Sequence, residues 1–149
     1  MASGRPIFEE LTRAESDEIL ARNHVGRLAY SFRDDVDVVP VHYAYDGEWV
    51  YFRTGAGTKL LTLQKSPWAA FEVDEVEGNF TWRSVVVRGT VYRADPEGDA
   101  RDREAFVRGV ELLRAVVPDS FTEDDPVAHR TVLLRLYANE VTGRRAREE

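Results

Sequence analysis

The chain contains no cysteine, and this absence excludes several kinds of chemistry. Disulfides, thiolate nucleophiles and cysteine-bound metals all need that residue. Long apolar runs are missing as well, because no stretch approaches the ~20 residues of a membrane-spanning helix. The first ten residues include Arg5, Glu9 and Glu10 in place of an apolar signal segment. We therefore expect a cytoplasmic protein with no membrane partner.

Positive charge is scarce, since 20 basic residues face 27 acidic ones and the formal net charge is -7. Nucleic-acid binding depends on clustered lysine and arginine to neutralise phosphates. The composition therefore argues against a nucleic-acid partner. The one dense basic cluster is Arg144, Arg145 and Arg147, which we interpret as a solvated terminus. A negative surface still leaves room for a local positive pocket.

The pattern of apolar residues predicts a mainly β protein with flanking helices. A length of 149 residues with 43% hydrophobic content suits a single domain over residues 1–149. Alternation and turn signals predict strands over residues 25–33, 36–46, 48–54, 68–75, 80–94 and 133–141, the last ended by Gly143. Helices are expected from the capping box Thr12–Glu15 to Asn23, over 58–65, and from Asp95-Pro96 to Pro118. This order favours a six-stranded antiparallel barrel.

A glycine-rich turn is the most informative segment for function. Gly55 and Gly57 free backbone amides that can point together at one anion. Thr58 adds a hydroxyl donor, and Arg53 and Lys59 add positive charge on either side. The order of these residues does not match an ATP-type phosphate loop. The turn is typical of a site for the phosphate of a cofactor, and a tight turn with a solvated lysine is the alternative.

The sequence shows no catalytic constellation of its own. His24, His42 and His129 lack the spacing of metal ligands. Glu72 and Asp74 share one face of a strand, where a solvated face or a barrel rim explains them. A protein that holds a phosphate without acids, bases or nucleophiles would leave the chemistry to its cofactor.

Several short motifs then occur in a particular order. They are Gly26-Arg27-Leu28-Ala29, Val39-Pro40-Val41, Tyr51-Phe52-Arg53-Thr54, Gly57-Thr58-Lys59, Ala70–Asp74, Trp82–Gly89 and Thr142–Arg145. Together they resemble the pyridoxamine 5'-phosphate oxidase-like flavin-binding split-barrel family, in particular the branch that includes nitroimidazole-resistance proteins. The likeness runs from residue 11 to residue 145 and implies a six-stranded antiparallel split β-barrel.

The resemblance implies a homodimer that holds FMN at the subunit interface. The residues that would bind the phosphate are Arg53, Thr54, Thr58 and Lys59. Those along the flavin ring would be Val39, Pro40, Val41 and His42, and those closing the site from the partner subunit would be Trp82, Arg83 and Ser84. Pro40 requires an edge or a bulge in its strand, which would leave backbone groups free for a ligand.

The function that follows is a flavin-dependent oxidoreductase acting on small electron-poor substrates, with NADH or NADPH as a candidate donor. Two alternatives stay open: a non-catalytic flavin or haem sensor, and a deazaflavin-dependent reductase on the same fold. Vitamin B6 oxidation is not expected, because the basic residues that hold its substrate phosphate cannot be placed. His42 could face the ring or the core, and we favour the ring because it shares a face with Pro40.

Overall fold

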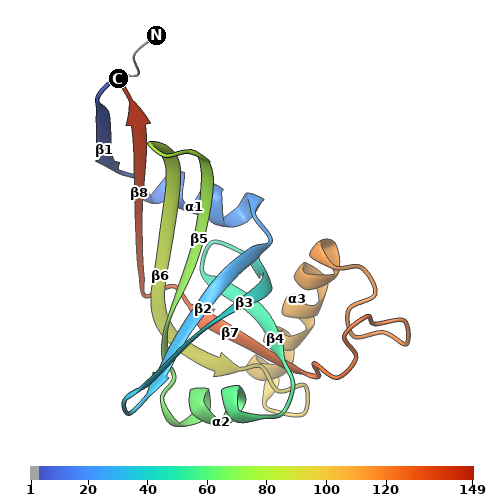
Figure 1. The fold of residues 1–149 in the computed structure, drawn as a ribbon. Helices are drawn as coiled ribbons and strands as arrows, with labels where there is room; N and C mark the ends of the chain where they lie inside the picture. Colours follow the sequence, from blue (N-terminus) through green and yellow to red (C-terminus); the bar gives the residue numbers. More distant parts are fainter. Residues whose placement is uncertain (1–3) are drawn as a thin grey trace.

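A computed structural model describes residues 4–149 as strands of one curved sheet with three helices packed against it (Figure 1). The strands are β1 (Pro6–Glu10), β2 (Val25–Phe32), β3 (Asp35–Tyr45), β4 (Trp49–Thr54), β5 (Trp68–Gly78), β6 (Thr81–Arg93), β7 (Val132–Tyr137) and β8 (Glu140–Glu148). The helices are α1 (Arg13–Arg22), α2 (Thr58–Lys65) and α3 (Ala100–Val116). Within the described residues, no helix is long and apolar enough to cross a membrane.

Six of the strands close into an antiparallel barrel, in the order β6-β5-β2-β3-β4-β7 with β7 returning to β6. The barrel splits along β6, because residues 82–88 pair with β8 whereas residues 91–93 pair with β7. Gly89 stands at this change of partner, where a Cβ atom would lie 1.8 Å from the carbonyl oxygen of Tyr137. Only glycine allows so close an approach. The predicted six-stranded antiparallel split barrel is thus confirmed.

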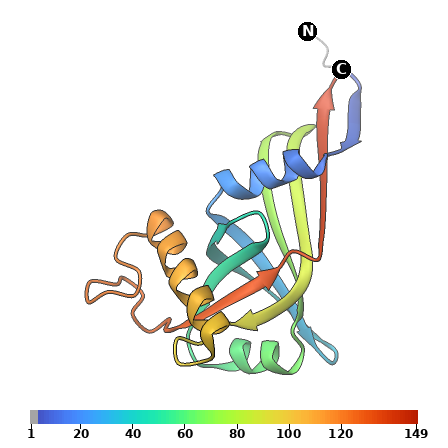
Figure 2. The ribbon, with the colours of Figure 1, turned by 180° about the vertical axis from the view of Figure 1, so that it is seen from behind.

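The C-terminal part differs from the prediction, because the single strand expected over 133–141 is wrong. The chain forms β7, turns, and forms β8, and Gly143 lies inside β8 instead of ending a strand. A Cβ atom on Gly143 would lie 2.4 Å from Oγ of Ser16, so the glycine lets α1 lie against β8. Figure 2 shows α1 crossing this arm of the sheet.

The basic cluster near the C-terminus is not a loose solvated tail. Strand β1, which the sequence did not predict, pairs with β8 along its length. The Nε atoms of Arg145 and Arg147 donate to the carboxylate of Glu9 at 2.7 and 2.9 Å. The two arginines therefore fasten β1 to the sheet.

The helix starts follow local capping signals. Thr12 and Glu15 form the predicted capping box at the start of α1. The predicted start of α3 at Asp95 is wrong, since the N-cap is Asp99, whose side chain accepts from the amide of Asp102. Asp95 instead accepts from the amide of Glu97 at 2.9 Å and closes a separate turn.

Apolar residues fill the barrel, and a second cluster lies between its outer wall and α3. Strand β3 contributes to both apolar clusters, because Tyr43 is fully buried inside the barrel while Ala44 packs beneath α3. The Tyr43 ring meets Phe71 edge-on at 4.8 Å, and its hydroxyl donates to the carbonyl of Leu20. Tyr43 thereby joins the end of α1 to the barrel core, and α3 is held over β3, β4 and β7.

Candidate functional site

The glycine-rich turn leads into α2, which begins at Thr58 as predicted. Its N-cap is Gly57, and no side chain caps the first turn. The first amides of a helix have no partners inside it, so they are available to an anion, and the helix dipole adds positive potential. No atom lies within 4 Å of where a Cβ on Gly57 would be, and Thr58 is exposed. The turn thus presents open donors.

A second segment, residues 117–131, approaches the same turn. The carbonyl oxygen of His129 lies 3.0 Å from the position of a Cβ on Gly55, so a side chain there would crowd the backbone of this segment. Arg130 is the next residue in the chain, and its charge affects Lys59. The pKa of Lys59 is lowered from its usual value by partial burial and, to a smaller extent, by the charge of Arg130. Two cations therefore share the space beside the start of α2.

Arg53 lies next to this space, but its guanidinium is already engaged. Nη1 and Nη2 donate to the two carboxylate oxygens of Asp125 at 3.1 and 2.6 Å. Nε and Nη2 also donate to the carbonyl oxygen of Arg130 at 3.0 and 2.7 Å. These bonds use four of the five N–H donors of a guanidinium. Arg53 holds the 117–131 segment in place, and its predicted contact with a phosphate stays a prediction.

Thr54, like Arg53, is buried and already forms a hydrogen bond within the chain. Its side chain is buried, and its hydroxyl donates to the carbonyl oxygen of Gly55 at 3.2 Å. Of the residues predicted for the phosphate, the structure leaves Thr58 and Lys59 open to a ligand. Thr54 and Arg53 shape the turn from beneath.

A hollow of about 320 Å³ opens beside Arg53 and Arg130, between β3, β4, the end of α3 and the 117–131 segment. Arg53, Arg130 and His42 supply its polar wall, and the apolar wall includes Val41, Leu113, Val117, Pro126 and Val127. His42 is exposed and lines this hollow, so it does not face the core. The alternative in which His42 faces the core is therefore wrong, and its contact with a flavin ring stays a prediction.

The strand that carries His42 has an open edge at the same place. Strand β2 pairs with β3 from Asp35 to His42, but β4 pairs only with Tyr43–Tyr45. The backbone groups of residues 35–42 that point toward β4 thus have no strand partner. Pro40 lies in this stretch, so the predicted edge location is confirmed and no bulge is needed. An open edge beside a hollow can bond the polar rim of a flat ligand.

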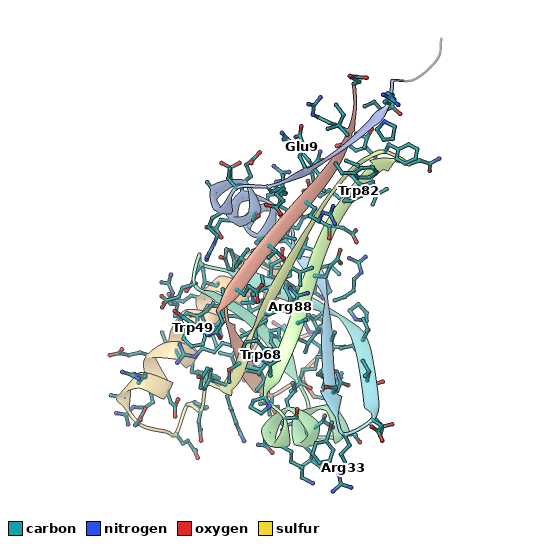
Figure 3. The ribbon with its side chains drawn as sticks, turned by 90° about the vertical axis from the view of Figure 1, so that its left-hand side faces the viewer. Glu9, Arg33, Trp49, Trp68, Trp82 and Arg88 are labelled. Carbon is teal, nitrogen blue, oxygen red and sulfur yellow. The ribbon has the colours of Figure 1, made fainter. Side chains whose placement is uncertain are left out.

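Trp82 and Ser84 are not brought to this hollow within one chain. Figure 3 shows Trp82 near the tip of the β5–β6 hairpin, at the end of the molecule opposite to α2. Its ring lies 6.3 Å from that of Phe8. Ser84 donates to Glu72 at 3.0 Å on the outer face of the sheet. The pKa of Glu72 is raised by burial and by a hydrogen bond with Asp74.

The sequence did not indicate two residues of the site. Arg130 and Asp125 lie in a segment without periodicity, and neither belongs to a motif. Asp125 is 72 residues away from Arg53, so the ion pair leaves no local trace. The only signal was the charge of Arg130 itself, which resembles any surface arginine.

Comparisons with known proteins agree with this architecture. The sequence model of a family described as pyridoxamine 5'-phosphate oxidase matches residues 12–145. A Rhizobium meliloti protein is 30% identical over 79 residues, which are 53% of this chain and 52% of that protein. The chain thus matches about half the length of that relative.

Solved structures match over nearly the whole chain. An FAD-binding protein of Mesorhizobium loti is 25% identical with a TM-score of 0.76, covering 96% of this chain and 99% of that one. A Bacteroides thetaiotaomicron protein, provisionally assigned to 5-nitroimidazole antibiotic resistance, is 15% identical with a TM-score of 0.70, covering 99% and 92%. The second likeness shows the fold alone. Motifs, barrel and family match agree, and the chain belongs to the pyridoxamine 5'-phosphate oxidase family.

Proposed function

We propose that this protein is a cytoplasmic flavin-dependent oxidoreductase that holds FMN and reduces small electron-poor molecules. The observation that carries the proposal is the uncapped start of α2, where Lys59 lies near Arg130, a residue that lines the same hollow as His42. Helix amides and a lysine form a site for a phosphate group. The open edge of β3 and the apolar wall of the hollow suit a flat ring with polar atoms on its rim.

Each residue then has a defined task. Thr58, Lys59 and the first amides of α2 hold the phosphate, and Arg130 adds a second positive charge. Arg53 positions Arg130 by donating hydrogen bonds to the Asp125 carboxylate and to the carbonyl oxygen of Arg130. The apolar residues of the hollow keep water from one face of the ring, and His42 stands at its mouth. A bound flavin supplies the electron transfer, since the chain offers no acid–base constellation of its own.

The phosphate site accommodates either flavin nucleotide. The Mesorhizobium loti relative binds FAD, which carries an adenosine phosphate beyond the phosphate that FMN ends on. The phosphate site at α2 is open to solvent at Gly57, so a longer tail would not collide there. FMN needs only the contacts named above, and we propose it as the cofactor.

The proposed assembly is a homodimer formed through the outer face of the sheet. Several large apolar side chains are exposed there or at its margins, including Phe8 at 53%, Val38 at 63% and Val76 at 70%. Large exposed apolar side chains on one face support the proposal that this face is a protein interface. Trp82 and Ser84 share a face of β6 and do not line their own hollow, so a second copy would bring them to the site.

The test is to add FMN to the purified protein, desalt it, and record the absorbance spectrum. Retained flavin bands support the cofactor, and NADH or NADPH oxidation with a nitroaromatic acceptor above the rate of free flavin supports the enzyme. Bound flavin without turnover would make the protein a sensor or carrier. Retention of the deazaflavin coenzyme or haem in place of FMN would overturn the cofactor.

A further inference from the structure

A second hollow lies at the other end of α3, where the first turn of the helix faces β4, β6 and β7. Its volume is about 610 Å³, within the range of small-molecule sites. It shares no residue with the hollow proposed for the flavin. Figure 3 shows Trp49, which lines it, beside the α3 end of the sheet and far from Trp82.

Aromatic rings form one wall of this hollow. Trp49 meets Tyr137 edge-on at 5.0 Å and Tyr92 edge-on at 5.7 Å. Tyr92 is 49% exposed, which leaves part of its ring open for stacking. A flat ring of a ligand would find apolar contact here.

Three arginines add positive charge to the lining of this hollow. Arg93, Arg101 and Arg135 line it, and none of them forms an ion pair within residues 4–149. Three unpaired cations facing one space are notable in a chain with a net charge of -7. They create a local positive potential that favours an anion.

Arg135 gives the sharpest indication that an acceptor is missing. Strand pairing places it between Tyr51 and Tyr92, and its guanidinium covers the Trp49 ring at 3.8 Å. Its Nε atom is buried and has no hydrogen-bond partner among the described residues. A buried donor without an acceptor is costly, so such groups in native proteins usually serve a ligand or an ordered water.

Two carboxylates narrow the choice of ligand. Glu48 and Asp102 line the same hollow, and they would repel a bare anion. They would, however, accept hydrogen bonds from sugar hydroxyls, as acidic residues do in nucleotide sites. A ligand with a phosphate for the arginines, a ribose for the carboxylates and a flat base for the aromatic wall meets all three features. We propose that this hollow binds a nucleoside phosphate.

The test is calorimetric titration of the full chain with 5'-AMP. Arg135→Gln and Arg101→Gln should each weaken binding at least tenfold. Arg101 is exposed at the start of α3, so its loss leaves the fold intact even if Arg135→Gln unfolds. Arg103→Gln is the matched control, because Arg103 lies on the same helix, is exposed and does not line this hollow.

Further titrations separate the possible outcomes. Lys59→Ala should leave AMP affinity unchanged, and a loss there would mean that AMP occupies the proposed flavin site instead. If NADH binds more tightly than AMP and Arg135→Gln removes that binding, the nucleoside phosphate in this hollow is the adenosine end of a dinucleotide. Failure of AMP to bind, equal binding of inorganic phosphate, or affinity unchanged in both arginine variants would overturn the proposal.

Discussion

Asp125 and Arg53 form a two-point ion pair in which both side chains are almost fully buried, at 2% and 8% exposure. The guanidinium also lies over the Phe121 ring at 4.0 Å, and the amide of Phe121 donates to Asp125 at 2.7 Å. Phe121 has a φ of 61°, a region that bulky residues avoid. The ion pair therefore holds a strained segment against the barrel, with Arg130 at its end.

Replacing Asp125 with asparagine should release this segment. Arg53 holds the pKa of Asp125 well below its usual range, so the charged pair persists in mild acid and only substitution removes it. Amide hydrogen exchange of residues 119–130 should become at least tenfold faster, because the strained backbone loses its support. Asp124→Asn is the control, since Asp124 is exposed and its side chain accepts no hydrogen bond within the described residues. Equal exchange in both variants would show that the ion pair does not hold the segment.

Lys59→Ala should weaken FMN binding about 10- to 100-fold, the usual effect of losing a charge-assisted hydrogen bond to phosphate. The dissociation constant is measured by flavin fluorescence quenching. Lys65→Ala is the matched control, because Lys65 lies in the last turn of the same helix and is exposed. A Lys59→Ala protein with unchanged affinity would refute the phosphate assignment.

A mixing experiment tests whether each proposed flavin site draws on two copies of the chain. Lys59→Ala and Trp82→Ala proteins are each expected to bind FMN poorly. In a mixed dimer, one site would combine both defects and the other would contain intact Lys59 and intact Trp82. Mixing after brief unfolding and refolding should therefore restore tight binding to about a quarter of all sites.

Restoration depends on the two residues coming from different subunits. If Lys59 and Trp82 of the same chain served one site, no mixture would regain FMN binding. Lys59→Ala mixed with Lys59→Ala is the control, because it can form no intact site. Sedimentation of each protein beforehand should show a dimer, and a monomer would contradict the proposed interface.

Glu75 should make the protein sensitive to acid. Hydrogen bonds from Arg22, and with smaller effect from Arg83 and Asn23, lower its pKa from 4.5 to about 2, although burial opposes the shift. A carboxylate with a lowered folded-state pKa stabilises the fold above its unfolded pKa and loses that effect as pH falls through the folded value. The stabilisation is therefore complete above about pH 4.5 and disappears toward pH 2.

The Glu75→Gln variant measures this contribution. We expect a loss of about 2 kcal/mol at neutral pH, a value reduced for solvent screening because Arg22 is half exposed. The free energy of unfolding, measured in urea at neutral pH and near pH 3, should depend less on pH in the variant. Glu77→Gln is the control, since Glu77 is 62% exposed and within residues 4–149 its carboxylate pairs with Arg83 alone. An identical pH dependence in Glu75→Gln and the parent protein would contradict the assignment.

The sequence predicted those parts of the fold that depend on local signals. Helix α2 was expected over 58–65 and occurs at Thr58–Lys65, because the glycines before it and Pro67 after it set its limits. Strand β1 was missed because its five residues include Glu9 and Glu10 and form a strand only by pairing with β8. Glu9 and Arg145 are 136 residues apart, a distance at which no local pattern operates.

The residues of the candidate site also divide into those that local sequence signals predicted and those that depend on distant contacts. Thr58 and Lys59 follow from the turn itself, and His42 follows from its shared face with Pro40. The engagement of Arg53 could not be inferred, because whether a guanidinium is free depends on what the rest of the chain places beside it. The residues proposed to meet across a dimer interface depend on a second chain and stay predictions.

The open edge of β3 also bears on how the protein behaves without a ligand. An unpaired edge is a template for other chains, and Val36 and Val38 are 71% and 63% exposed along it. Asp35, Asp37 and Pro40 interrupt this stretch, and charges and proline at an edge discourage strand addition. We therefore expect these three residues to oppose self-association of the ligand-free protein through this edge, and Pro40→Val to increase it.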